Sequence, residues 1–235
     1  MPRPCGKGWV VIACDVCRRR YAVPYSCNRR SCPRCGPRVA WAWARLAEAF
    51  AGGAQWPAFL TLTRRWRRDV TLAAYLKDTW RCFYALRRLK VFRSCVGGLA
   101  VAKLQHGEMG VRVHVHAVLD ARWIPWKEMV AAWRRLTDGD FIVRVERLKR
   151  RGGDARRAGR YVAKYMAKAF EVGIERARLV VRWGSARDVK APGLLCPCCL
   201  QSEWLWCGSR SSRPEDAPRL VTTRAPPPEF RQESA

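Results

Sequence analysis

Two kinds of ionisable side chain are scarce in this chain. It has only 3 histidines and 19 aspartates and glutamates among 235 residues. The shortage of histidine makes a pair of histidines informative. No run of about 18 apolar residues occurs, which argues against a transmembrane helix. Residues 1–13 lack the long apolar segment of a secretion signal, so we expect a cytoplasmic protein with no membrane partner.

Basic residues, by contrast, are abundant. The 46 lysines and arginines give a formal net charge of +27 at pH 7. A surface with this charge repels itself unless it meets a polyanion, and nucleic-acid phosphates are the commonest one. Because 49% of the residues are hydrophobic, the chain can also form a packed core. The composition favours a folded nucleic-acid-binding protein and leaves its chemistry open.

Cysteine is also frequent, with 12 residues. In a reducing cytosol, closely spaced cysteines favour a metal site over disulfides. Cys14 and Cys17 form one Cys-x2-Cys pair and Cys32 and Cys35 form another, which is typical of four thiolates around zinc. We therefore predict a cysteine-rich zinc-binding module over residues 1–38, which either only folds this end of the chain or also contacts DNA.

Other cysteines leave alternatives open. Cys5 or Cys27 can replace one of the four predicted zinc ligands. A second group lies in residues 191–208 and consists of Cys196, Cys198, Cys199 and Cys207. This group either forms a second metal site, locally or with an N-terminal cysteine, or consists of free thiols.

Hydrophobic periodicity predicts the secondary structure. The predicted helices span residues 39–50, 71–90, 125–136 and 155–170. The predicted strands span residues 59–63, 96–106, 111–119, 141–148 and 178–183. This order implies an α+β domain over residues 39–190, with a central, mainly antiparallel sheet and flanking helices. Residues 209–235 are rich in Ser, Pro and Arg, and we predict a disordered basic tail there.

Two of the three histidines form the sequence His114-Val115-His116 inside a predicted strand. Residues i and i+2 of a strand point to the same face of a sheet, so both imidazoles project together and can hold one divalent cation. The alternative is a pair of ordinary half-buried histidines, which is the commoner case for an isolated pair.

A metal ion that assists phosphodiester cleavage usually has a third protein ligand and open coordination positions. If residues 108 and 109 form the turn between two strands, Gln105 lies on the same face as the histidines. Glu108 is a harder oxygen ligand but belongs to the turn, and a slipped register brings His106 to that face instead. We predict Gln105 as the third ligand, and such an oxygen donor suits Mg²⁺ or Mn²⁺.

A stripe of tyrosine and lysine follows on the last predicted helix. Tyr161, Lys164, Tyr165 and Lys168 occupy positions i, i+3, i+4 and i+7, which share one helix face. A phenol is a poor nucleophile at neutral pH because its pKa is near 10, and neighbouring lysine cations favour its phenolate form. Taken without the histidine pair, the stripe would indicate aromatic residues at the edge of the core beside solvated lysines.

An arginine-rich segment directly follows the first strand predicted for this domain. It contains Arg64, Arg65, Arg67 and Arg68. We predict that these side chains contact DNA phosphates; the alternative is a solvated basic loop.

Taken in their order along the chain, these motifs resemble the HUH endonuclease superfamily, specifically the rolling-circle replication initiators of small plasmids and single-stranded DNA phages. Residues 59–63 resemble the first motif of that family, and residues 114–116 resemble its metal-binding motif of two histidines around a hydrophobic residue. Residues 161–168 resemble its nucleophile motif in the two-tyrosine form. Residues 27–35 are similar to the cysteine-rich start of several initiators, so the resemblance covers about residues 14–190.

The resemblance implies a ferredoxin-like or RRM-like sheet domain that nicks one strand of single-stranded origin DNA. Tyr165 matches the single tyrosine of one-tyrosine relatives, so it would form the link to the 5′ phosphate, and Tyr161 would be the second nucleophile. The freed 3′-OH would prime synthesis by a host DNA polymerase. Because the chain lacks a Gly-x4-Gly-Lys-Ser/Thr motif, a bacterial host helicase would unwind the duplex.

Two further interpretations stay open. The same chemistry also serves HUH transposases and plasmid-mobilisation nickases, which differ in the fate of the cut strand. A non-catalytic zinc-ribbon nucleic-acid-binding protein would have the zinc module and the charge, with the histidines and tyrosines as packing residues.

Overall fold

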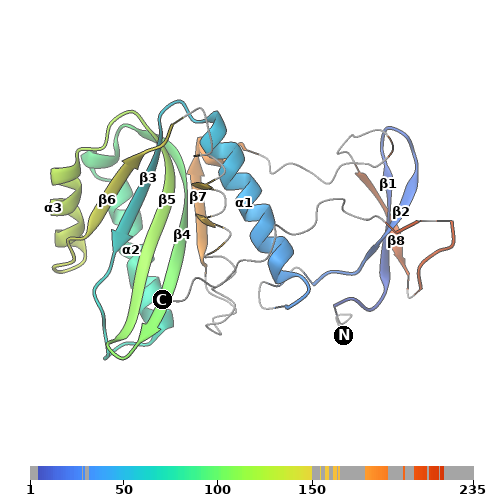
Figure 1. The fold of residues 1–235 in the computed structure, drawn as a ribbon, viewed down its shortest axis with the longest axis horizontal. Coiled ribbons are helices and arrows are strands. Elements are labelled where there is room, and N and C mark those ends of the chain that lie inside the picture. The colour runs from blue at the N-terminus through green and yellow to red at the C-terminus, as the bar shows by residue number, and fades with distance from the viewer. Residues whose placement is uncertain are drawn as a thin grey trace. The chain divides into compact units, whose positions relative to one another are not determined.

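The computed structural model describes residues 5–27, 29, 32–149, 154, 157–158, 161–162, 164, 178–189, 198, 204–210, 212–216 and 218–219. The chain divides into two compact units, one formed by Met1–Trp41 with Pro192–Ala235 and the other by Ala42–Ala191. The fold is of the α+β class, and each unit has its own sheet (Figure 1). No helix within the described ranges has the length and apolar character needed to cross a membrane.

The larger unit contains a five-stranded sheet in the order β6-β3-β5-β4-β7, and every neighbouring pair is antiparallel. Its strands are β3 (Pro57–Thr63), β4 (Cys95–Gly107), β5 (Gly110–Ala121), β6 (Val143–Arg147) and β7 (Val180–Gly184). The antiparallel sheet predicted from periodicity is therefore confirmed, with shifts of a few residues at the strand ends.

The β4–β5 hairpin has the register that places the candidate metal ligands. Gly107 pairs with Gly110, so Glu108 and Met109 form the turn, and Gln105 lies opposite Arg112 as predicted. Gly110 has a φ of 104°, and a Cβ atom there would lie 2.1 Å from the Arg67 carbonyl oxygen, so this tight connection requires glycine.

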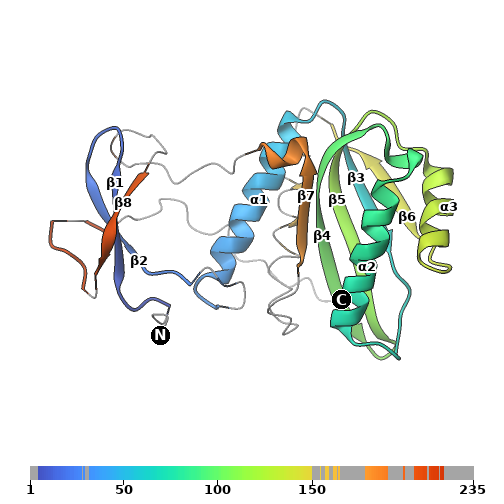
Figure 2. The ribbon, with the colours of Figure 1, turned by 180° about the vertical axis from the view of Figure 1, so that it is seen from behind.

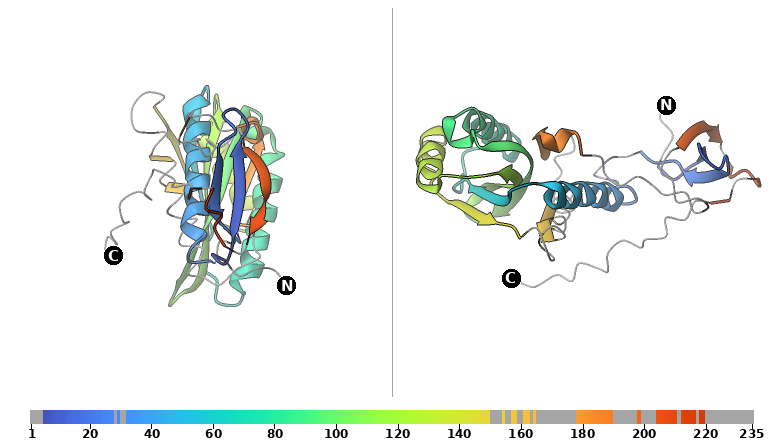
Figure 3. Two further views of the ribbon diagram at one scale, coloured as in Figure 1. Left: turned by 90° about the vertical axis from the view of Figure 1, so that its right-hand side faces the viewer. Right: turned by 90° about the horizontal axis from the view of Figure 1, so that it is seen from above.

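Three helices accompany this sheet: α1 (Gly36–Gly53), α2 (Leu72–Arg87) and α3 (Trp126–Leu136). The Thr71 side-chain oxygen accepts a hydrogen bond from the Ala74 backbone N–H at 3.3 Å, which caps the start of α2. α2 and α3 cover one face of the sheet, as Figure 2 shows from behind. α1 lies on the opposite side from α2 (Figure 3).

Alternation along the strands separates the two faces of the sheet. On β3, Leu60 and Leu62 are fully buried and point to the side of α2 and α3, since Trp133 of α3 donates a hydrogen bond to the Thr63 carbonyl at 3.3 Å. Phe59, with Val118 of β5, points to the other side and packs with residues of α1.

The predicted helix over residues 155–170 is only partly within the described ranges. Its described members, with Asp154, are helical: Arg157, Ala158, Tyr161, Val162 and Lys164. Ala158 and Val162 are buried, and Ala158 belongs to the same cluster as Val118, so this segment also covers the face opposite α2. Tyr165 and Lys168 lie outside the described residues.

The smaller unit is a three-stranded antiparallel sheet that sequence patterns did not predict. Its strands are β1 (Trp9–Cys14), β2 (Arg20–Pro24) and β8 (Trp204–Arg210), in the order β2-β1-β8. The pairing of β1 with β8 joins the predicted N-terminal module of residues 1–38 to residues 191–208 in one unit.

The predicted disordered tail starts at residue 209, which lies within β8. β8 continues through Ser209 to Arg210, and two further contacts hold the chain that follows it. Arg20 forms an ion pair with Asp216 at 2.6 Å, and the Ala22 backbone N–H donates to the Pro218 carbonyl at 2.9 Å. Residues 220–235 lie outside the described residues.

Candidate functional site

His114 and His116 lie on β5, the central strand of the larger sheet, and their side chains share one face. We call this the histidine face; the neighbouring strand β3 contributes Thr61 and Thr63 to it. The Nδ1 atom of His114 is 3.0 Å from the Thr63 Oγ1 atom, and that of His116 is 3.1 Å from the Thr61 Oγ1 atom. The two rings are nearly parallel, with an interplanar angle of 5° and centroids 5.9 Å apart. The threonines therefore fix the orientation of both imidazoles.

Gln105 of β4 completes the predicted set of three ligands. Its Oε1 atom lies 3.4 Å from the Nε2 atom of His114. In the tautomer with the proton on Nδ1, Nε2 has a lone pair, so two acceptors face each other across this distance. Two ligand atoms each about 2.1 Å from a metal ion, at right angles, are about 3 Å apart. The spacing of these two atoms is compatible with one small divalent cation between them, and the threonine hydroxyls contact the imidazole nitrogens that would face away from it.

Burial and nearby cations keep both imidazoles neutral. Burial, with Arg112 and Lys103, lowers the pKa of His114 to about 4. Burial, with His114 and Lys103, lowers the pKa of His116 to about 3. Neutral imidazole is the metal-binding form, so protonation does not compete with a cation for this pair at physiological pH.

The two other candidates for the third ligand lie elsewhere. His106 is exposed and pairs with Val111, so it belongs to the opposite set of side chains from Gln105. Glu108 is exposed in the turn. The hairpin register therefore brings Gln105, and neither His106 nor Glu108, beside His114.

Tyr161 lies against the histidine pair. Its ring meets that of His116 edge to face, with centroids 4.8 Å apart at 85°, and meets that of Phe59 at 4.9 Å and 87°. Lys164, one turn further along the helical segment, is exposed. A tyrosine, two imidazoles and an amide oxygen thus come from three separate segments to one place on the sheet.

Thr61 and Thr63 contact the candidate site but were not among its predicted residues. Thr61 and Thr63 belong to the strand that resembles the first motif of the family, and their alternation places them on one face. What the sequence did not predict is the pairing of β3 with β5, which puts each threonine opposite one histidine.

The four arginines after β3 do not form one exposed track. Arg64 is only 4% exposed and is buried among carboxylates; its Nε atom lies 2.5 Å from Asp140 and its guanidinium also contacts Asp78 at 3.0 Å. The other three arginines are exposed or half-buried: Arg65 pairs with Asp140 at 3.5 Å, Arg67 with Asp69 at 2.9 Å, and Arg68 is exposed. Arg64 therefore stabilises the fold, and the expected DNA contact is left to Arg65, Arg67 and Arg68.

In the smaller unit, four cysteines gather at one point. The sulfur atoms of Cys5, Cys27, Cys32 and Cys35 all lie within 4.8 Å of one another. Four sulfurs about 2.3 Å from one tetrahedral ion would be about 3.8 Å apart, so this cysteine cluster fits zinc. The backbone N–H of Cys35 lowers the pKa of the Cys32 thiol, which favours the thiolate that a metal binds.

The cysteine cluster differs from the predicted zinc set in two members. Cys5 and Cys27 join Cys32 and Cys35, whereas Cys14 lies at the end of β1 and packs with Tyr21. Cys17, the other predicted ligand, also packs against that group. In the predicted second cluster, Cys198 and Cys207 are exposed. Cys196 and Cys199 lie outside the described residues.

Comparison of the chain with protein-family models, with curated proteins and with solved structures found no match.

Proposed function

We propose that this protein is a metal-dependent, single-strand DNA endonuclease of the HUH type that initiates rolling-circle replication. The observation that carries the proposal is the contact of the Tyr161 ring with His116, because it brings a phenol to a pair of imidazoles that also face an amide oxygen. The net charge of +27 supports a DNA strand as the substrate.

In this proposal His114, His116 and Gln105 hold Mg²⁺ or Mn²⁺. The bound ion would polarise the phosphodiester and stabilise the charge that develops on its oxygens. The tyrosine oxygen loses its proton and attacks phosphorus, the bond from phosphorus to the 3′ oxygen breaks, and that oxygen leaves as a 3′-OH after taking up a proton. Attack by a 3′-OH on the phosphotyrosine reverses the step and rejoins the ends.

Two tyrosines divide the work. We propose Tyr165 as the nucleophile of the first cut, from the motif it matches, and Tyr161 as the nucleophile that ends the cycle. Lys164 and Lys168 would bind the phosphate and favour the phenolate form. Host helicase and polymerase would supply strand separation and synthesis, and zinc in the cysteine cluster would stabilise the smaller unit.

The first experiment is a test for a covalent adduct. The protein is incubated with Mn²⁺ and labelled single-stranded DNA that tiles candidate origins, and the products are separated under denaturing conditions. We expect a protein-linked DNA band that chelation abolishes and that His116→Ala reduces by at least about 100-fold, since removing one group that stabilises the transition state costs about 3 kcal/mol. Tyr165→Phe should remove the adduct of the first cut, and Tyr161→Phe should preserve it.

The matched control for His116→Ala is His106→Ala, which removes the exposed histidine outside the candidate site. It should leave the adduct unchanged. If wild-type protein binds the strand but gives no adduct with any sequence, the enzyme proposal fails, and a non-catalytic zinc-containing DNA-binding protein takes its place. Strand transfer to a second DNA in place of repeated displacement would instead indicate a transposase or a mobilisation nickase.

A further inference from the structure

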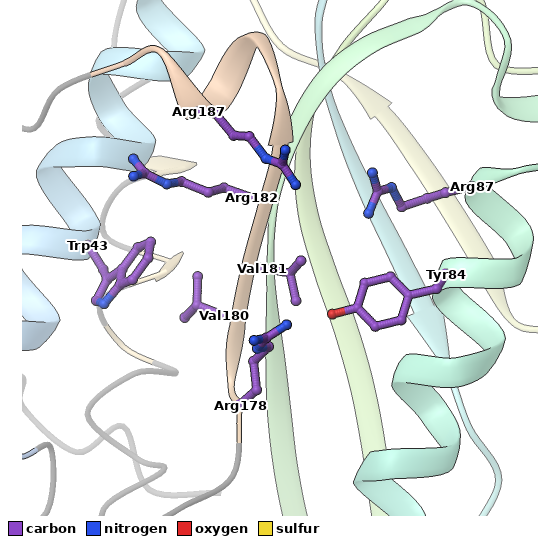
Figure 4. A pocket seen from close by; sticks show the side chains of 8 residues that line it. All are labelled: Trp43, Tyr84, Arg87, Arg178, Val180, Val181, Arg182 and Arg187. Carbon is purple, nitrogen blue, oxygen red and sulfur yellow. The ribbon is translucent and has the colours of Figure 1, made fainter.

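The edge strand β7 of the larger sheet carries a basic pocket that the nicking chemistry does not use. The pocket has a volume of about 270 Å³. Four arginines and two aromatic residues line it: Arg87, Arg178, Arg182, Arg187, Trp43 and Tyr84. The remaining lining residues are valines, so no carboxylate among the described residues faces the four cations in this pocket. Figure 4 shows Trp43 and Arg182 on one side of β7, and Tyr84 and Arg87 on the other.

The aromatic ring of Trp183 packs against the Arg87 guanidinium. The guanidinium lies 4.1 Å from the ring centre, and that indole fits only because residue 98 is glycine: a Cβ atom there would lie 2.4 Å from the ring. The Arg87 Nε atom is buried and has no hydrogen-bond partner within the described part of the chain. Burial also lowers the pKa of Arg87. A positioned, poorly compensated cation of this kind is stabilised by a bound anion.

The strand register relates this pocket to the histidine face. Val101 of β4 pairs with His116 on one side and with Val180 of β7 on the other, and Val180 lines the pocket. Neighbouring strands are about 4.8 Å apart, so Val180 lies about 10 Å from His116 across the sheet. A strand of DNA that occupies the nicking site and runs toward β7 would reach the arginines within a few nucleotides.

We propose that this pocket binds the phosphodiester backbone of the DNA strand that occupies the nicking site. This inference rests on the proposed function, because it places that strand on the same sheet. The arginines are distributed on both sides of an edge strand, which suits successive phosphates of a chain better than one small anion. Trp43 and Tyr84 line the pocket and are half-buried, so an unpaired base beside a bound phosphate would contact an aromatic ring, as in single-strand binders that hold DNA without reading its sequence.

The test measures how binding of a single-stranded oligonucleotide depends on salt. The variant is Arg182→Gln/Arg187→Gln, since both side chains are exposed and their replacement leaves the core intact. The matched control is Arg134→Gln/Arg135→Gln, which removes the same charge from exposed positions of α3 outside the pocket. Each lost phosphate contact reduces the slope of log K against log salt by about 0.7, so the pocket variant should lose about 1.4 and the control much less.

If the pocket variant and the control have equal slopes of log K against log salt, the pocket arginines contribute only to the general charge of the protein, and the proposal is overturned. The competing ligand is a free phosphate ion, which is tested by adding inorganic phosphate at matched ionic strength. If phosphate stabilises wild type but not the pocket variant against unfolding, and both proteins have the same salt slope for DNA binding, the site binds phosphate and not a strand. Binding with the expected slopes but no adduct in wild type would instead remove the nicking proposal and leave the pocket as a binding site for single-stranded DNA.

Discussion

Single side chains on the histidine face determine whether a cation can bind there. Thr61 and Thr63 contact the Nδ1 atoms of His116 and His114, and Gln105 faces the Nε2 atom of His114. This arrangement matters because a metal ion would bind the imidazole nitrogen that does not contact a threonine hydroxyl. The residues of the site thus differ in what their substitution should change: the ligands alter metal affinity, and the buried imidazole also alters stability.

Gln105 should contribute directly to metal affinity. Its Oε1 atom lies 3.4 Å from the Nε2 atom of His114 and is the proposed oxygen donor, so we expect Gln105→Ala to raise the dissociation constant for Mn²⁺ by at least about tenfold, or about 1.4 kcal/mol. Gln105→Glu should bind Mn²⁺ at least as tightly as wild type, because a carboxylate is a harder donor of the same reach. Titration followed by electron paramagnetic resonance measures both. Wild-type affinity in the alanine variant would show that the amide is not a ligand.

His116 should make the stability of the protein depend on pH. The folded protein holds its pKa at about 3, mainly by burial, against 6.5 for an ordinary histidine. Below pH 6.5 the unfolded chain therefore binds a proton at His116 that the folded protein does not bind, and the free energy of unfolding decreases as pH falls. Without added divalent cation, urea unfolding at pH 7 and pH 5 should show a smaller loss for His116→Gln than for wild type. His106→Gln, at an exposed position, should behave as wild type; equal losses in all three proteins would contradict the prediction.

At the scale of elements, a buried ion pair ties the end of β3 to the chain between α3 and β6. Arg64 and Asp140 have side chains that are 5% and 1% exposed. Asp140→Ala leaves the Arg64 charge buried without its closest partner, so we expect a loss of about 3–5 kcal/mol in the free energy of unfolding. Asp69→Ala breaks the Arg67 pair at a 67% exposed carboxylate, where solvent screens the charges, and should cost much less. Urea denaturation compares the two; similar losses would mean that the pair does not determine local stability.

Some features of these elements could be predicted from the sequence and others could not. The β4–β5 hairpin could be predicted together with its register, because alternation and a turn with glycines at both ends act over neighbouring residues. From that register followed the place of Gln105 beside His114. The burial of Arg64 could not be predicted, since its partners Asp78 and Asp140 lie 14 and 76 residues away and only the tertiary fold brings them together.

At the scale of the whole molecule, the two end segments of the chain form one unit. Local sequence patterns could not predict this association. β8 pairs with β1 although most of the chain lies between them, and the cysteine cluster takes Cys5 and Cys27 in place of Cys14 and Cys17. Spacing alone identified two Cys-x2-Cys pairs but not their partners, because metal ligands are selected by distance in space. Of the two Cys-x2-Cys pairs near the N-terminus, Cys32 and Cys35 belong to the cysteine cluster, whereas Cys14 and Cys17 lie outside it.

The pair outside the cluster leads to a prediction about metal content. In the β1–β8 register Cys14 lies opposite Trp204, the first residue of β8, and in the sequence Cys196 and Cys199 come shortly before Trp204. Cys14 thus ends β1 beside the first residue of β8, and the second Cys-x2-Cys pair precedes β8 by a few residues in the sequence. Two such pairs supply the four thiolates that a second zinc ion would need. We expect two zinc ions per chain by elemental analysis, one of them lost in Cys35→Ser and the other in Cys14→Ser. Cys95→Ser, in the larger unit, is the control and should retain both. A Cys14→Ser protein with the full wild-type zinc content would rule out the second site while leaving the cysteine cluster intact.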